Sequence, residues 1–165
     1  MVRPSQRVPV VPMTSLDAAQ VRRQRWLSVL AKAPADRLEV LWQSLGQAPS
    51  YSVLRRPEIG LVMVQGRISG SGAPFAAGEM TVTRAAVRLQ TGQLGIGYVA
   101  GRHPRQAEIV AALDAMGQMP EWQHQIEDRV VAPLVAEADA RRRLRAAKAA
   151  ATKVDFFTVA REAGT

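Results

Sequence analysis

Large apolar residues near the start of the chain recur with the spacing of a helix. From residue 14 onward they fall mostly three and four residues apart, at Val21, Trp26, Leu27 and Leu30. This is the period of one helix face. Thr14, with Asp17 three residues later, is the expected N-cap. Pro34 then fits the first position of a second helix that ends at Gly46, so this part of the chain predicts a helical hairpin.

The middle of the chain has the composition of β-strands. Residues 51–56 predict a short strand that Pro57 ends, and residues 59–68 read IGLVMVQGRI. Residues 61–64 are apolar at odd and at even positions alike, so both faces of this second strand are expected to be covered. The glycine-rich residues 69–74 predict a flexible link.

The next stretch, GEMTVTRAAVRL at residues 78–89, changes its alternation at Arg84. Its larger apolar side chains fall on even positions before Arg84 and on odd positions after it. Because strand side chains alternate between faces, the buried face is expected to switch there. Arg84 is therefore either a surface residue beside a bulge or a side chain directed at a ligand.

A turn at Thr91 and Gly92 is expected to join this strand to LGIGYVAG. In that register Arg88 faces Gly95, and Arg84 and Arg88 stand over a floor of glycine, which often marks close approach by a ligand. The guanidinium fork binds phosphate and carboxylate groups bidentately. Arg84 and Arg88 are therefore candidates for contact with an anion or a partner, and a solvent-exposed pair is the alternative.

A helix is predicted to begin at Pro104 and to end at Gly117. His103 is its expected N-cap, with Gln106 placed to reach back. Because helix N-termini attract anions, Arg102 and His103 are further anion- or partner-binding candidates. An ordinary structural cap is the alternative for His103.

The C-terminal third predicts a helix from Pro120 that Pro133 kinks or breaks. Residues 134–153 are rich in alanine and arginine, which favours a helix with little to bury. Phe156 and Phe157 follow, and they are expected to anchor this arm internally or on a partner.

Together these elements predict the α+β class: a small, mainly antiparallel sheet with flanking helices and an extended C-terminal helical arm. The expected divisions are a disordered or adherent Pro-rich tail at residues 1–13, an α+β domain at 14–133 and the helical arm with its aromatic anchor at 134–165.

Composition excludes several kinds of site. The chain has no cysteine and two histidines, so disulfides, a thiolate nucleophile and an iron–sulfur cluster held by this chain alone are excluded, and a self-contained zinc site is not expected. No stretch approaches the ~20 apolar residues of a membrane helix. The net charge of +8 fits nucleic acid, an acidic partner or a phosphorylated substrate.

Four segments resemble one known family. These are RRQRWLSVLA, GLVMVQGRISGSGAPFAAGEMTVTRAAVRL, GQLGIGYVAGRHPRQAE and KVDFFTVAR, and in this order they are similar to the PhnG family, subunits of the bacterial carbon–phosphorus lyase core complex. The resemblance runs from about Arg22 to Glu162.

The resemblance implies an accessory subunit of a cytoplasmic hetero-oligomer with three other core subunits, two copies of each. That complex transfers a phosphonate to C1′ of the ribose of ATP and releases adenine, giving α-D-ribose 1-methylphosphonate 5-triphosphate. MgATP would be a substrate of the complex, and an iron–sulfur cluster with S-adenosylmethionine would belong to a partner subunit. This chain would hold no cofactor or metal and no catalytic residue, and neither membrane nor nucleic acid is expected as a partner. The alternative, suggested by charge, is a basic nucleic-acid-binding protein.

Overall fold

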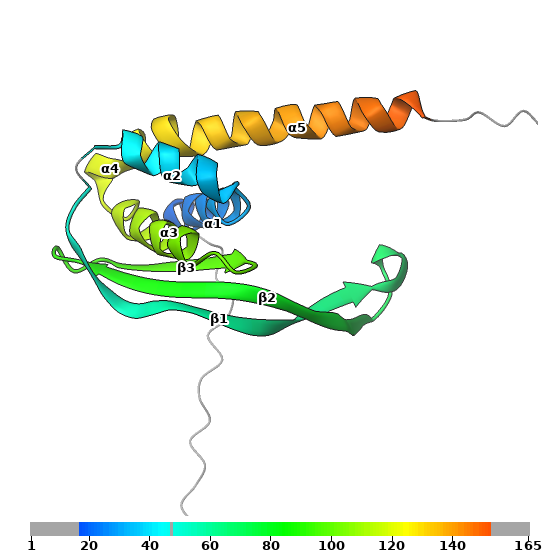
Figure 1. Cartoon of the computed structure of the whole chain (residues 1–165), viewed down its shortest axis with the longest axis horizontal. Helices are drawn as coiled ribbons and strands as arrows, with labels where there is room; N and C mark the ends of the chain where they lie inside the picture. Colours follow the sequence, from blue (N-terminus) through cyan, green and yellow to red (C-terminus); the bar gives the residue numbers. More distant parts are fainter. Residues whose placement is uncertain (1–16, 47, 153–165) are drawn as a thin grey trace, which may run out of the picture.

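Three antiparallel strands form one sheet, and the helices lie on one side of it (Figure 1). The computed structural model describes residues 17–46 and 48–152. The elements, in chain order, are α1 (Ala18–Leu30), α2 (Ala35–Ser44), β1 (Tyr51–Arg67), η1 (Ile68–Gly70), β2 (Pro74–Leu89), β3 (Leu94–Ala100), α3 (Pro104–Met116), α4 (Pro120–Ile126), η2 (Glu127–Val131) and α5 (Ala132–Ala151). The predicted α+β class is confirmed.

The predicted helical hairpin is confirmed as α1 and α2, but the N-cap assigned to Thr14 is wrong. Helix α1 begins at Ala18, and its N-cap is Asp17. The Asp17 carboxylate accepts a hydrogen bond from the Gln20 backbone N–H at 2.7 Å, and the Gln20 side chain accepts from the Asp17 N–H. Glutamine three residues after the N-cap completes the capping box. With Thr14 as the N-cap, the residue at that position would be an aspartate, Asp17.

Helix α3 is the centre of the core, because it lies between the sheet and the other helices (Figure 1). The largest fully buried side chains come from every layer and include Leu30, Leu38, Leu89, Ile109, Leu113 and Ile126. Gln106, expected to cap α3, is instead buried and donates to the backbone carbonyls of Leu30 and Ala33. It satisfies carbonyls at the end of α1, which a helix cannot pair internally.

The sheet and α3 approach each other closely at two glycines. A Cβ added to Gly97 would lie 1.8 Å from the Ala107 carbonyl oxygen, and one added to Gly95 would lie 1.9 Å from that of Ala111. Alanine occupies every fourth position of α3 here, at Ala107, Ala111 and Ala115. Small residues on both surfaces therefore set the distance between helix and strand.

The predicted register between β2 and β3 is wrong by one residue. Arg88 pairs with Leu94 and Val87 pairs with Gly95. The Leu89 N–H donates to the Gln93 carbonyl at 3.0 Å, which leaves a three-residue loop with Gly92 at φ +101° instead of a two-residue turn. A shift of one residue exchanges the faces, so the glycines face α3 and the arginines face away from it.

Strand β1 is one long strand, whereas two strands separated by Pro57 were predicted. Its pairing with β2 shifts between Val53 and Arg55 and again between Arg55 and Glu58. These bulges absorb Pro57, which has no N–H to give to a ladder. The irregularity expected at Arg84 therefore lies in the strand opposite it.

The far halves of β1 and β2 continue beyond the domain as a two-stranded ribbon (Figure 1). We call residues 61–81 the ribbon: it comprises the ends of both strands, beyond the part of β2 that pairs with β3, and the glycine-containing turn at their tip. The predicted cover on both sides of residues 61–64 is wrong, because Leu61 is 63% exposed and Met63 is 58% exposed. No helix of the described chain packs on them.

Helix α5 follows α4 through a π-helical turn, η2, which ends two residues before Pro133. The wider turn makes room for a proline ring that would collide with the preceding turn of an α-helix. Leu134 is buried in the core, but residues 140–152 are all exposed, and α5 projects beyond the domain (Figure 1). Within the two described ranges, no helix combines the length and the apolar character needed to cross a bilayer.

Candidate interaction surface

The outer face of the sheet, opposite the helices, carries exposed arginine, aromatic and aliphatic side chains. Arg84 pairs with Tyr98 across the ladder and Arg88 pairs with Leu94, with Ile96 between them on β3. All five side chains are exposed. Arginine and tyrosine beside aliphatic groups are the composition enriched at protein interfaces. We call this set the outer face.

Arg84 is already paired within the chain. Its Nε donates to the Glu58 carboxylate, and Arg55 donates to the same oxygen of Glu58. The hydrogen bonds from Arg55 and then Arg84 lower the pKa of Glu58, so this carboxylate is ionised at neutral pH. Arg84 is thus held in place beside Tyr98 and is not a vacant anion site.

Arg88 differs from Arg84, because no carboxylate of the described residues pairs with it. It is exposed on the same face, four residues along β2. The structure therefore brings two predicted residues to one face, and Arg88 is the one whose guanidinium can pair with a partner's carboxylate.

Arg102 and His103 lie apart from these arginines, just beyond the end of β3. His103 is the N-cap of α3, as predicted, but its side chain makes no capping hydrogen bond. Its backbone N–H donates to the Thr83 hydroxyl at 3.0 Å, and that hydroxyl donates to the Gly101 carbonyl. The backbone here is tied to the sheet, and both side chains are exposed. Phe156 and Phe157 lie outside the described residues.

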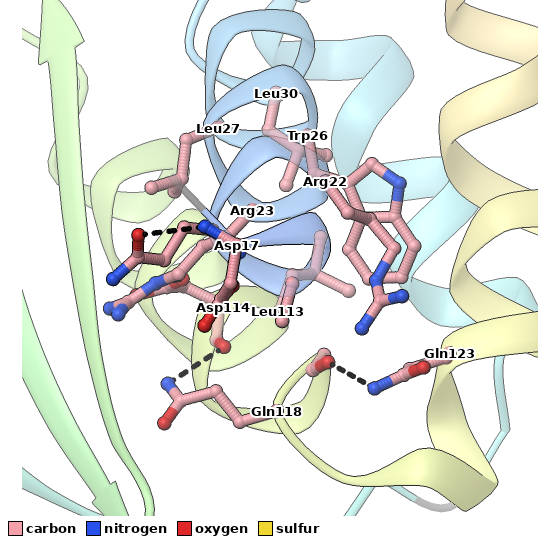
Figure 2. A pocket seen from close by; sticks show the side chains of 13 residues that line it. Asp17, Arg22, Arg23, Trp26, Leu27, Leu30, Leu113, Asp114, Gln118 and Gln123 are labelled. Carbon is pink, nitrogen blue, oxygen red and sulfur yellow. Dashed lines mark hydrogen bonds and ion pairs between the residues drawn. The ribbon is translucent and has the colours of Figure 1, made fainter. Parts of the chain in front are cut away.

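A pocket of about 230 Å³ lies between α1 and the C-terminal end of α3. Figure 2 shows the side chains that line it, among them Arg22, Arg23, Trp26, Asp114, Gln118 and Gln123. Sequence reasoning did not find this pocket. Arg22, Arg23 and Trp26 belong to the RRQRWLSVLA segment, but Asp114 lies about ninety residues further on, and nothing in either segment indicates that they meet.

Most polar groups of this pocket are bound within the chain, and Arg22, which lies 6.0 Å from the centre of the Trp26 ring, has no hydrogen-bond partner among the described residues. Arg23 donates to both oxygens of Asp114, at 2.7 and 2.8 Å, and the Asp114 side chain is 1% exposed. Asp114 also accepts the backbone N–H of Ile96 at 2.9 Å. The amides of Gln118 and Gln123 donate to backbone carbonyls. This network joins α1, α3 and β3, which makes the pocket a structural junction with few groups left for a ligand.

The described residues hold no set of acids and histidines from which a metal site could be built, and the chain contains no cysteine. His124 is paired with Asp128 on an exposed face. Tyr51 donates to Glu108 at 2.7 Å, and partial burial, then that hydrogen bond, raises the pKa of Tyr51. A phenol held protonated in this way is a poor base. The geometry is suited to recognition by surface contact.

Comparison with known proteins assigns the family. The family model described as phosphonate metabolism protein PhnG matches residues 21–162. The chain belongs to the PhnG family. A curated relative from Rhizobium meliloti (strain 1021), the α-D-ribose 1-methylphosphonate 5-triphosphate synthase subunit PhnG, is 40% identical over 148 residues, covering 90% of this chain and 94% of the relative. The resemblance inferred from the four segments is confirmed.

Membership in the PhnG family gives the outer face and the ribbon a context. The matched range includes all of both, together with all of α5. The name of the relative describes a subunit, and a subunit needs surfaces for its neighbours.

Proposed function

We propose that this chain is an accessory subunit of an α-D-ribose 1-methylphosphonate 5-triphosphate synthase, the carbon–phosphorus lyase core complex of phosphonate catabolism. The observation that carries the proposal is the 40% identity, over nine tenths of the chain, to a subunit of that synthase. The complex attaches a phosphonate to C1′ of the ribose of ATP and releases adenine.

The catalytic residues belong to partner subunits in this proposal. Chemistry at C1′ of a ribose needs a positioned base or acid and a held nucleophile. In the pocket the Asp114 carboxylate is bound by Arg23, and on the outer face the Glu58 carboxylate is bound by Arg55 and Arg84, so neither carboxylate is free to act as a base. The chain then acts by shaping or supporting a neighbour's site.

Cofactors are assigned in the same way. MgATP is a substrate of the complex, and the iron–sulfur cluster with S-adenosylmethionine belongs to another subunit, because cysteine thiolates are the usual ligands of such clusters and this chain has none. The assembly is cytoplasmic, with three other core subunits in two copies each. Arg88, Arg102 and His103 remain candidates for contact with a partner or an anion, and Arg84, which is bound to Glu58, remains a candidate for contact with a partner.

Co-expression tests this function. The tagged chain, produced with the other three core subunits, is expected to co-purify with them, and the purified assembly is expected to release adenine from MgATP and methylphosphonate. The chain alone should release none. Turnover by the solitary chain, or failure of the chain to co-purify, would contradict the proposal. Retention on DNA with a steep salt dependence, and no co-purification, would favour nucleic-acid binding instead.

A further inference from the structure

The C-terminal half of α5 is a basic projection. Residues 140–152 contain four arginines and one lysine and no acidic residue, and all of them are exposed. They extend away from the helices and the sheet (Figure 1). A helix with so little apolar surface to bury gains little from its own domain, so its charges are available to another molecule.

Most of these cations share one side of the helix. Successive residues of an α-helix are turned by about 100°, so Arg141, Arg145 and Lys148, at spacings of four and three, lie in line. Arg142 borders this line, and only Arg143 falls on the opposite side. We call Arg141, Arg142, Arg145 and Lys148 the basic face. It covers about a third of the circumference of the helix, so one surface can meet all four cations.

A groove of about 240 Å³ adjoins the basic face, between the end of α1 and α5. Apolar side chains of both helices line it, among them Val29 on α1 and Val135 on α5. Its lining also includes Lys32, together with Arg141 and Arg142 of the basic face. Groove and basic face are therefore one continuous surface, with apolar side chains at one end and cations along its length.

Charge complementarity favours an acidic partner over a second copy of this chain. The carboxylates of α5 are already bound within the chain, Glu137 by Arg37 at 2.7 Å and Asp139 by Arg142 at 3.4 Å. Elsewhere in the described ranges, the carboxylates that no arginine or histidine binds lie on four different parts of the chain. They are Asp17, Asp36, Glu79 and Glu121. A second copy thus offers no cluster of free carboxylates to the basic face, and contact between two basic faces would be repulsive.

The apolar side chains of this surface favour a protein over a nucleic acid. Leu144 lies beside the basic face on the helix and is 58% exposed, and the groove is partly apolar. A phosphate backbone would pair with the cations but would leave these side chains uncovered. A protein surface can supply carboxylates and apolar groups together.

We propose that the basic face and its groove dock on an acidic segment of another subunit of the synthase, one apolar side chain of which enters the groove. This inference rests on the proposed function and adds which surface of α5 is used and what chemistry receives it. Carboxylates of the partner pair with Arg145 and Lys148, which have no carboxylate partner among the described residues.

Competition for the complex tests the basic face. The wild-type chain and a variant, with different tags, are co-expressed with the other three core subunits, and their shares in the purified assembly are compared. Arg145→Glu/Lys148→Glu is expected to be under-represented by at least about tenfold. Arg145→Gln/Lys148→Gln, which keeps a high helix propensity, is expected to fall between this variant and the wild type.

The matched control is Arg56→Glu/Arg129→Glu. It makes the same change in charge at two exposed arginines of β1 and η2 that have no carboxylate partner among the described residues. The control is expected to share the complex equally with the wild type. Higher salt in the growth-independent step, an exchange of purified chains into the complex, should reduce the deficit of the reversal variant.

Cross-linking identifies what lies against the basic face. A carbodiimide joins a lysine amine to a carboxylate in contact with it, so Lys148 is expected to become linked to an aspartate or glutamate of another subunit, as read by mass spectrometry. Lys148→Arg keeps the charge but lacks the amine. It is expected to enter the complex like the wild type and to lose that cross-link.

The outcomes separate this inference from the proposed function. A wild-type chain that recovers no partner contradicts the proposed function, and this inference with it. Partners recovered normally, with equal shares for the reversal variant and the control, overturn the inference and leave the function standing. A Lys148 cross-link only to a second copy of this chain, or DNA retention that Arg145→Glu/Lys148→Glu abolishes without changing its share in the complex, would also overturn it.

Discussion

At the scale of single residues, the structure depends on where small and charged side chains are placed. Gly95 and Gly97 were interpreted from the sequence as the floor of an anion site under two arginines. They are instead contact points for α3, because a three-residue loop shifts β3 by one position relative to β2. The sequence also has alanine at every fourth position of this part of α3. Only the contact between α3 and β3 shows that these alanines face the two glycines.

Replacing Gly97 with alanine is therefore expected to destabilise the fold. The added methyl would lie 1.8 Å from a backbone oxygen of α3, so helix and strand must separate, at a cost of about 3 kcal/mol in the free energy of unfolding. Gly60→Ala is the control, since a Cβ at Gly60 meets nothing within 4 Å. Urea denaturation of both variants measures the difference, and equal midpoints would contradict the close approach.

Glu127 is expected to make stability depend on pH. Its carboxylate accepts hydrogen bonds from Arg25 at 2.7 and 3.0 Å and from the Trp26 indole at 2.6 Å. Partial burial raises the pKa of Glu127, but the bonds from Arg25 and Trp26 outweigh it and the pKa is lowered. A lowered folded-state pKa means that the stabilisation is present above the unfolded value, about 4.3, and is lost as pH falls through the folded one.

Glu127→Gln should accordingly reduce the free energy of unfolding by about 1–2 kcal/mol at pH 7, and the difference from the wild type should shrink as pH falls below about 4. Chemical denaturation at several pH values measures this. Glu121→Gln, on the exposed side of α4, is the matched control and should leave the free energy of unfolding at pH 7 close to that of the wild type. A deficit that is the same at pH 7 and at low pH would assign the loss to packing alone.

At the scale of elements, periodicity predicted most helices and misjudged the strands. The apolar stripes of α1 and α2 are set by burial on one side, so they are visible in the sequence. Helix α3 is buried on nearly all sides, and its proline start and glycine end are what define it in the sequence. The apolar run in β1 looks like that of a buried strand, yet it is exposed. Pattern alone cannot distinguish a strand covered by its own chain from one that meets another protein, because both require apolar side chains on two faces.

Helix α5 illustrates a second limit. Residues 140–152 touch no core, and isolated helices of this length are marginal in water. In the solitary chain we expect the amides of residues 144–151 to exchange with solvent far faster than those of α3, as measured by hydrogen exchange. If α5 lies on another subunit, the complex should protect them. Protection equal to that of α3 in the solitary chain would contradict this expectation.

The contribution of α5 to assembly needs a careful truncation. Removal from Pro133 onward would also remove Leu134, which is part of the core. A stop after Asp139 leaves the core intact, and this shorter chain is expected to fold but to lose affinity for the complex. Full recovery of partners by the truncated chain would contradict docking by the helical arm.

At the scale of the whole molecule, the chain is a core with two projections, the ribbon and the end of α5 (Figure 1). The family and the fold class were predictable, because the order of the motifs and of the helices and strands is visible in the sequence without knowledge of how they pack. The placement of the candidate residues was not, since it depends on bulges in β1 and on one loop length. Arg84 and Arg88 share a face, while Arg102 and His103 sit beyond the end of the sheet.

The ribbon should be separable from the core. Leu61 pairs with Thr81 across the ladder. Replacing residues 62–80 with Asn-Gly removes the projection and supplies a favourable hairpin turn between the two strands. Because no core residue is lost, the melting temperature is expected to stay within about 4 °C of the wild type, the change that 1 kcal/mol would produce. Differential scanning calorimetry checks this, and a collapse of the transition would show that the ribbon supports the core.

The order of strands, β1–β2–β3, leaves β1 as an edge for its whole length. Its first half contains bulges, arginines and a proline, which disfavour pairing with the edge strand of another molecule. The segment IGLVMV at residues 59–64 carries no charged residue or proline and meets a bulge only at its end, between Val64 and Gln65, and it has the character of segments that form fibrils. A chain produced without its partner subunits is therefore expected to aggregate through this edge more readily than one produced with them.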